Sequence, residues 1–139
     1  MNVVPQHRPD EQVEADRLRP RLSWSRKVWV AFRGLKRGIR GQSSFFVHFF
    51  FAALVIAGAI VLECSAVQWG LLIICIGMVL TAELFNSALE TLAHSLEDVN
   101  RERVWPSLDI AAGAVILASI TAAIVGCIVF ITQLWEKLP

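Results

Sequence analysis

Three long stretches of this 139-residue sequence contain no Asp, Glu, Lys or Arg: residues 44–62, 64–82 and 110–135. Charged residues make up only 18% of the chain, whereas hydrophobic residues make up 55%. A soluble domain of this size has too little core volume to bury so much apolar surface. A disordered chain is instead poor in apolar residues and rich in charged ones. The composition therefore excludes a soluble globular enzyme and a disordered protein, and it predicts a small integral membrane protein.

Cysteine and phosphate-binding motifs are also scarce. The three cysteines lie too far apart for a CxxC site, and an odd count does not suit a disulfide framework, so we interpret them as packing or lipid-facing residues. The sequence contains no GxxxxGK[ST] loop and no soluble-kinase signature. We expect no nucleic-acid partner.

The charge-free stretches predict an all-α membrane fold with three spans. A bilayer core about 30 Å thick needs roughly 20 apolar residues in a helix. We expect spans at about 44–62, 67–93 and 110–135, with a tight turn between the first two and a loop over 94–109. No proline interrupts these spans, so each helix can satisfy its own backbone hydrogen bonds in lipid.

Basic residues set the expected orientation. Residues 1–43 hold ten of the thirteen Lys and Arg, and the expected 94–109 loop holds Arg101 and Arg103. The turn between the first two spans holds none, so the positive-inside rule places the N-terminus and the 94–109 loop in the cytosol. We expect no cleavable signal peptide, because the first apolar run follows 43 mostly polar residues.

The basic arm divides into two parts. Residues 1–22 are polar and predict a disordered tail, whereas residues 23–135 predict a single membrane domain. Over 24–40, apolar residues recur at helical spacing and basic residues fill the other faces, which predicts an amphipathic surface helix. Such a helix either lies in the membrane interface, which we favour, or packs on a protein core.

The most informative polar residues lie at the end of the second apolar run. Glu83, Asn86 and Glu90 occupy positions i, i+3 and i+7, so they share one helix face. An ionisable residue at membrane depth, such as Glu83, usually faces a protein interior or a wet cavity and is a functional-site candidate. Glu90 lies two turns further on, near the expected cytosolic interface.

This face suits two kinds of chemistry. A carboxylate in an apolar setting can act as a general base. A carboxylate at the water edge can hold Mg²⁺, which binds through one or two carboxylates and substrate phosphates. The alternative is polar contact between packed helices without catalysis. Two carboxylates and an amide at graded depth favour the functional interpretation.

Two features of the third span have simple structural explanations. Asp109 lies in the first turn of the expected helix, where capping and helix-dipole complementarity would account for it. Small residues then recur every fourth position, at 114, 118, 122 and 126. This stripe permits close helix packing, either within a protomer or between protomers.

Two blocks of sequence resemble the small prokaryotic diacylglycerol kinase family, which includes undecaprenol kinases. They are Ala82-Glu-Leu-Phe-Asn-Ser-Ala-Leu-Glu90 and Asp109-Ile-Ala-Ala-Gly-Ala-Val115. The stretch Ala31-Phe-Arg-Gly-Leu35 and the pair Phe45 and His48 also fit, more like the undecaprenol branch. The resemblance extends from about residue 23 to residue 130.

The resemblance implies a bacterial inner-membrane homotrimer that uses ATP and Mg²⁺ to phosphorylate a membrane lipid hydroxyl. Diacylglycerol is the expected substrate, and undecaprenol is the alternative. Glu83 matches the family's proposed catalytic base, Asn86 the motif residue that lines the site, and Glu90 a ligand of metal and nucleotide. Asp109 matches a nucleotide-side residue. Ser87, beside Asn86, is expected to contact the lipid together with Glu83.

Three positions depart from the family pattern. Gln42 stands where the family has a second metal-binding Glu, Leu108 where it has a Lys, and His94 where it has an Asp. Gln42 still offers a carbonyl oxygen to Mg²⁺, and His94 is either an exposed interfacial residue or a nucleotide contact. Candidates to replace the missing charges are Lys36, Arg37, Arg40, Arg101, Arg103, Glu97 and Asp98. These departures also motivate a second reading, in which the chain is a non-catalytic scaffold that binds lipid or a partner.

Overall fold

The structure is a computed structural model that describes residues 23–40, 42–96 and 98–138. The polar tail predicted over 1–22 lies outside the described residues. Four helices follow in order: α2 (Trp24–Arg40), α3 (Ser44–Val61), α4 (Ala66–His94) and α5 (Asp98–Lys137). Residues up to Gly34 form one unit and residues from Leu35 onward form a second, so each is described by itself.

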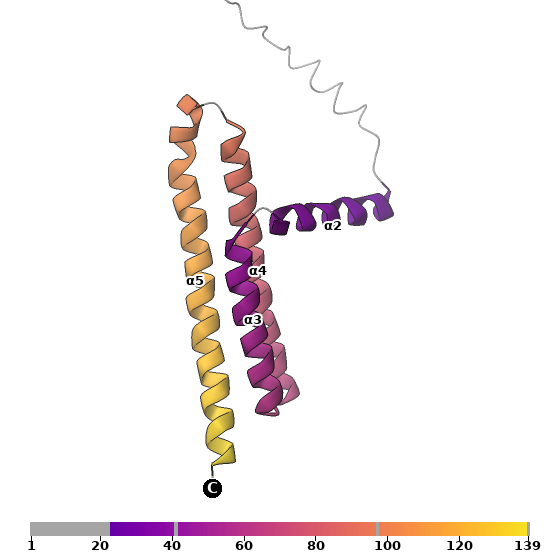
Figure 1. The fold of residues 1–139 in the computed structure, drawn as a ribbon, viewed down its shortest axis with the longest axis vertical. Helices are drawn as coiled ribbons and strands as arrows, with labels where there is room; N and C mark the ends of the chain where they lie inside the picture. The colour runs from indigo at the N-terminus through magenta and orange to yellow at the C-terminus, as the bar shows by residue number, and fades with distance from the viewer. Residues whose placement is uncertain (1–22, 41, 97, 139) are drawn as a thin grey trace, which may run out of the picture. The chain divides into compact units, whose positions relative to one another are not determined.

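Helices α3, α4 and α5 run side by side with alternating direction (Figure 1). α4 packs mainly against α5, whereas α3 makes fewer contacts with either helix. All three helices are long and apolar enough to cross a membrane. The prediction of an all-helical fold with three such helices and an N-terminal helix is confirmed.

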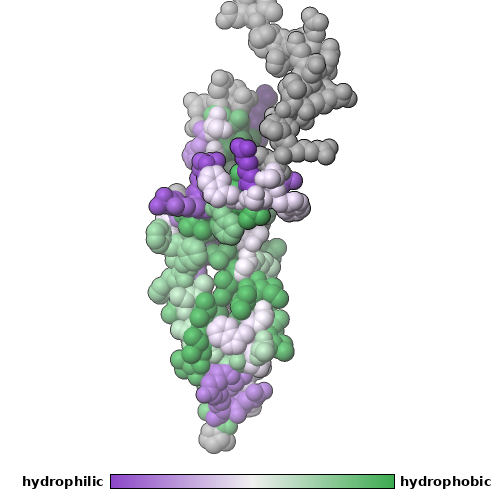
Figure 2. All heavy atoms as spheres, turned by 90° about the vertical axis from the view of Figure 1, so that its right-hand side faces the viewer, coloured by the Kyte–Doolittle hydropathy of each residue, from purple (hydrophilic) through white to green (hydrophobic). Residues whose placement is uncertain are grey.

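Most of the bundle's apolar surface faces outward. Phe46, Phe85 and Ile116 are exposed, and only a minority of each candidate span is buried inside the chain. Figure 2 shows a hydrophobic band along the bundle, with hydrophilic surface gathered at its lower end. An outward apolar band of this length is what a bilayer solvates.

A small core holds the three helices together near the α3–α4 turn. Ala59, Cys64, Leu72 and Val129 are buried there, with Phe130 packed against them. The other two cysteines differ from each other, since Cys75 is buried and Cys127 is exposed. Ala118 and Gly126 of the small-residue stripe are buried, so part of the stripe is used within one protomer.

Specific caps form the α3–α4 turn. The backbone N–H of Cys64 donates to the carbonyl of Ala59 at 3.0 Å, and that of Glu63 donates to Ile60 at 3.1 Å. Together these bonds make a Schellman motif, with Glu63 in the left-handed position at φ 52°. Ser65 and Gln68 then form a reciprocal capping box at the start of α4.

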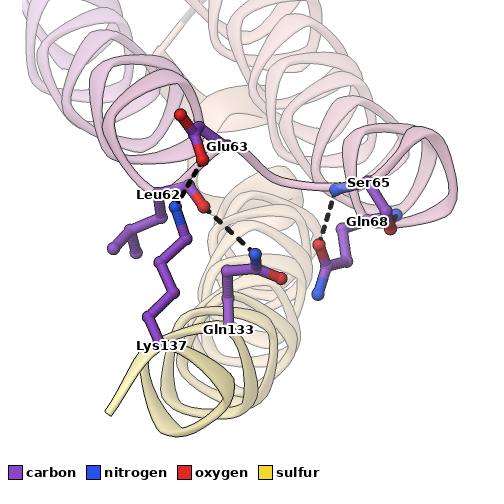
Figure 3. Close-up of polar contacts among 6 residues, drawn as sticks. All are labelled: Leu62, Glu63, Ser65, Gln68, Gln133 and Lys137. Carbon is purple, nitrogen blue, oxygen red and sulfur yellow. Dashed lines mark hydrogen bonds and ion pairs between the residues drawn. The ribbon is translucent and has the colours of Figure 1, made fainter. Parts of the chain in front are cut away.

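The end of α5 is fixed to this turn by two side chains (Figure 3). Gln133 Nε2 donates to the carbonyl of Leu62 at 3.1 Å, and Lys137 Nζ lies 2.7 Å from Glu63 Oε2. The Lys137 hydrogen bond and its positive charge hold the pKa of Glu63 below its ordinary value. Because Glu63 is fully exposed, solvent weakens this pair.

The third helix begins earlier than the sequence predicts, whereas the membrane span expected over 110–135 lies inside this helix and stays a prediction. α5 begins at Asp98 and continues through Pro106, so most of the expected 94–109 loop is helical. Asp109 therefore lies well inside the helix and does not cap its first turn. The reason is packing, because Val104 and Leu108 line a small pocket against Leu92 and Leu96 at the end of α4. That contact outweighs the local helix-start signals around the proline.

The first unit contains the beginning of α2. The guanidinium carbon of Arg33 lies 4.6 Å from the Trp29 ring, and Lys27 Nζ lies 5.4 Å from the Trp24 ring. Such cation–π pairs combine apolar and charged surface on one helix. No residue of α2 is buried, and Trp24 is 82% exposed. Placement of α2 in a membrane interface stays a prediction.

Candidate active site

One face of α4 is polar in the middle of an apolar helix. Glu83, Asn86 and Ser87 are buried, with 3%, 8% and 2% of their surfaces exposed, and Glu90 is half-buried. Helical spacing places all four on the side of α4 that the bundle covers. A face of this kind costs stability in an apolar environment unless its polar atoms find partners.

Glu90 accepts a hydrogen bond on each carboxylate oxygen. Asn86 Nδ2 donates to Oε1 at 2.8 Å, and Gln42 Nε2 donates to Oε2 at 2.7 Å. Gln42 precedes α3, so this contact joins two segments that lie far apart in the sequence. The structure thus brings together Glu90 and Gln42, the two residues expected to bind the metal, with Asn86, which was expected to line the site.

Chain packing explains how Gln42 reaches Glu90. Gly38, near the end of α2, lies so close to α4 that an added Cβ would be 2.8 Å from Leu84 Cδ2. At the start of α3, Phe45 is 2% exposed and anchors the helix. Gln42 lies between these two close contacts and extends to the half-buried carboxylate of Glu90.

Glu83 faces an imidazole from the neighbouring helix. His48 Nε2 on α3 lies 3.7 Å from Glu83 Oε2, and the exposed fractions of the two side chains are 19% and 3%. Sequence analysis noted His48 only as part of a resemblance and missed it as a site residue. One signal could have identified it, because His48 is the only ionisable side chain among residues 44–62.

Three buried polar atoms on this face have no hydrogen-bond partner within the described part of the chain. They are Glu83 Oε1, Asn86 Oδ1 and Ser87 Oγ. Buried polar groups in native proteins are nearly always paired, so each such atom calls for an explanation. Three of them on one face of α4 make this surface the candidate place for a polar ligand.

The expected nucleotide-side residues form no polar contact with this cluster among the described residues. Asp109 and His94 are exposed, and neither forms a hydrogen bond or ion pair with Glu83 or Glu90 among the described residues. Leu108 is half-buried in the apolar pocket of about 200 Å³ between α4 and α5. An aliphatic side chain therefore fills space where the family pattern has a cationic one.

Most candidates for the missing charges form no ion pair with the cluster among the described residues. Lys36, Arg37, Arg40 and Arg103 are exposed, and none forms an ion pair with Glu83 or Glu90 in residues 23–40, 42–96 and 98–138. The side chains of Asp98 and Arg101, and all of Glu97, lie outside the described residues. Hydrogen bonds from two amides thus replace charge around Glu90.

The donor set at Glu90 fits Mg²⁺ better than a transition metal. One carboxylate, the Gln42 amide and the unpartnered Asn86 Oδ1 are all oxygen-bearing groups. Mg²⁺ prefers oxygen and binds through one or two carboxylates together with substrate phosphates. Among the described residues, no three His, Cys, Asp or Glu side chains group together, so an all-protein metal cage is not built here.

An apolar cavity of about 460 Å³ lies between the three membrane helices. Its walls come from α3, α4 and α5, and apart from His48 and Ser119 they are almost entirely aliphatic, aromatic or thiol side chains. Cys75 and Cys127 are both in the wall. His48 thus lines the cavity and also lies close to the buried carboxylate of Glu83.

Comparison with known proteins identifies the class of molecule to which this site belongs. The model of the prokaryotic diacylglycerol kinase family matches residues 29–130, and the chain belongs to this family of lipid kinases. It is 28% identical over 104 residues to undecaprenol kinase from Bacillus subtilis (strain 168), covering 75% of this chain and 85% of that protein. It is 34% identical over 97 residues to diacylglycerol kinase from Synechocystis sp., covering 69% of this chain and 55% of that protein. No solved structure matches the chain significantly.

Proposed function

We propose that this protein transfers the γ-phosphoryl group of ATP to the hydroxyl of a membrane lipid, with diacylglycerol as substrate and phosphatidic acid as product. One observation carries the proposal. A buried carboxylate with an unpartnered oxygen, Glu83, shares a helix face with the hydrogen-bonded Glu90 in a chain of the lipid kinase family. The arrangement separates a lipid-side base from a phosphate-side carboxylate along α4.

The chemistry follows from this separation. The lipid hydroxyl oxygen attacks the γ-phosphorus, a new O–P bond forms, and the bond from that phosphorus to the ADP oxygen breaks. Glu83 takes the hydroxyl proton as the oxygen attacks. General base catalysis of this kind typically raises the rate by about 10²- to 10⁴-fold. Asn86 and Ser87 hold the reacting oxygen atoms, since their buried polar atoms are unpartnered among the described residues. Phosphoryl transfer depends mainly on positioning and charge stabilisation, so few groups suffice.

Glu90 would hold Mg²⁺, with Gln42 and Asn86 supplying neutral oxygen ligands. Bound Mg²⁺ neutralises charge on the phosphates during transfer. Gln42 orients the Glu90 carboxylate through its 2.7 Å hydrogen bond. Asp109, inside α5, and His94, at the end of α4, are both exposed and are proposed to contact the nucleotide. A homotrimer in the bacterial inner membrane, with a cytosolic N-terminus, would let a second protomer bring such groups closer.

Undecaprenol is the second candidate substrate. The chain covers 85% of the length of the B. subtilis undecaprenol kinase, against 55% of the Synechocystis diacylglycerol kinase. The greater coverage favours the undecaprenol branch, whereas the higher identity favours the diacylglycerol branch. A direct comparison of the two lipids decides between them.

A non-catalytic scaffold is the remaining alternative. Leu108 lines an apolar pocket, and Gln42 places an amide beside Glu90 where the family has a second carboxylate. Both features would weaken binding of MgATP. A scaffold need not bind MgATP at physiological concentrations, whereas a kinase must.

The test is a phosphorylation assay on purified protein in nanodiscs with radiolabelled MgATP. Diacylglycerol and undecaprenol are offered separately, and equilibrium binding of MgATP is measured on the same samples. The proposal expects labelled lipid and saturable MgATP binding. If the folded protein neither binds MgATP nor transfers label to either lipid, the scaffold is favoured.

A further inference from the structure

Among the described residues, the imidazole of His48 is the ionisable group from an adjacent helix that lies next to the buried Glu83. Its Nε2 lies 3.7 Å from Glu83 Oε2, which is longer than a hydrogen bond of about 2.7–3.2 Å. Catalytic hydrogen bonds are often long before substrate binds and tighten in the reactive complex. A small rotation of either side chain would close this gap.

In the part of the chain that the structure describes, no other ionisable side chain forms an ion pair or hydrogen bond with Glu83. α3 has no other ionisable residue, and α5 has no charged residue between 110 and 135. On α4, Glu90 is engaged by Gln42 and Asn86, and the thiols of Cys75 and Cys127 lie in the cavity wall. The basic residues near the end of α2, Lys36, Arg37 and Arg40, are exposed.

The position of His48 also indicates a path for the proton that the lipid hydroxyl gives to Glu83. Glu83 is 3% exposed, so a proton on this carboxylate has no direct contact with solvent. His48 is 19% exposed and also lines the 460 Å³ cavity. Of the two side chains, the imidazole is the more exposed, and it lies in the second turn of α3, near the start of that helix, so it is the one placed to pass a proton onward.

We propose that His48 is a positioning residue whose unprotonated Nε2 accepts the proton of Glu83 and, once protonated, holds the restored carboxylate by a hydrogen bond. The inference rests on the proposed kinase function. After the lipid hydroxyl proton has moved to Glu83, it moves to His48 Nε2, which restores the carboxylate. The resulting imidazolium releases its Nδ1 proton to water. Proton exchange with water then moves the remaining proton from Nε2 to Nδ1, which frees Nε2 to accept again, so charge and protons balance over one turnover.

Two substitutions separate this role from simple packing. His48→Gln keeps a polar side chain that can donate to Glu83, but it cannot carry a proton between two nitrogens. His48→Ala leaves a space beside the cavity, which has room for free imidazole. Ser119→Ala is the matched control, because Ser119 is the other polar side chain of that wall and does not belong to the proposed site.

The experiment measures kcat and KM of the full-length protein in nanodiscs, with diacylglycerol and undecaprenol as probes. We expect His48→Gln to lower kcat about 10- to 100-fold while KM for ATP stays within about twofold. Added imidazole should restore part of the turnover of His48→Ala and none of that of Glu83→Gln. Ser119→Ala should match the unsubstituted protein, and circular dichroism and size-exclusion profiles should match for all variants.

Three results would overturn the inference. The first is a His48→Gln kcat equal to that of the unsubstituted protein, which would leave the kinase proposal intact. The second is a lowered kcat of His48→Ala that added imidazole does not restore, because loss of a purely structural residue gives that result. The third is an unsubstituted protein that phosphorylates neither lipid, which would remove the proposed kinase function and the proton transfer with it.

Discussion

Gln42 and Glu90, 48 positions apart in the sequence, are joined by a hydrogen bond of 2.7 Å. The amide neutralises none of the carboxylate's charge but fixes its orientation, and Asn86 fixes its other oxygen. A single oriented carboxylate is the least that Mg²⁺ requires when phosphates supply the rest of its ligands. This relationship makes the metal side of the site directly testable.

Gln42→Glu should increase the apparent affinity for Mg²⁺. The substitution places a second carboxylate beside Glu90, which favours a divalent cation and disfavours the metal-free state through like-charge repulsion. The measurement is turnover as a function of Mg²⁺ concentration, with the midpoint expected to fall several-fold.

The matched control for this change is Gln133→Glu. Gln133 also donates its amide across the bundle, but to the Leu62 carbonyl at the opposite end. Its Mg²⁺ midpoint should equal that of the unsubstituted protein. An unchanged midpoint in Gln42→Glu would remove Gln42 from the metal side of the site.

Leu108→Ala should destabilise the protein without changing nucleotide affinity. Leu108 is half-buried among apolar side chains of α4 and α5, so truncation should cost about 1–2 kcal/mol, less than a fully buried Leu→Ala change. Unfolding in mixed micelles and MgATP binding measure the two quantities. Weaker MgATP binding with unchanged stability would show that Leu108 contacts the nucleotide instead.

Glu63→Gly should be more stable than Glu63→Ala. The residue has φ 52°, a conformation that costs a residue with a Cβ about 1–2 kcal/mol relative to glycine. Both variants lose the contact with Lys137, so the comparison isolates the backbone effect. Equal unfolding midpoints would indicate that the turn adopts another conformation in the membrane.

The Glu63–Lys137 pair should contribute stability only at higher pH. Lys137 lowers the pKa of Glu63 in the folded protein by a hydrogen bond and by its charge. The contribution is therefore complete above the ordinary pKa of 4.5 and is lost as pH falls through the lowered value. The difference in unfolding midpoint between the unsubstituted protein and Glu63→Gln should disappear in acid. It should also shrink in high salt, since the pair is exposed.

Sequence reasoning located the membrane helices well because absence of charge is a strong signal in lipid. The expected spans near 44–62 and 67–93 agree with α3 and α4 to within one residue at each end. The beginning of α5 was wrong because its signals were local. Pro106 and Asp109 resemble a helix start, whereas the packing of Leu108 on α4 extends the helix beyond them.

The site was only partly predictable for a related reason. Glu83, Asn86 and Glu90 lie on one helix, so spacing alone places them on one face. The contact of Gln42 with Glu90 was expected only through family resemblance, because no local pattern links positions so far apart. His48 was missed because α3 is apolar on all sides, and its periodicity does not indicate which side faces α4.

Turnover of Glu83→Gln in nanodiscs is the most direct test of the central claim, that this chain is a lipid kinase with Glu83 as its base. Glu63→Gln is the control, since it makes the same chemical change at an exposed carboxylate by the α3–α4 turn. The account predicts lipid phosphorylation by the unsubstituted protein and by Glu63→Gln, and a loss of at least about 100-fold in Glu83→Gln with folding unchanged. Phosphorylation by Glu83→Gln at the unsubstituted rate would contradict it.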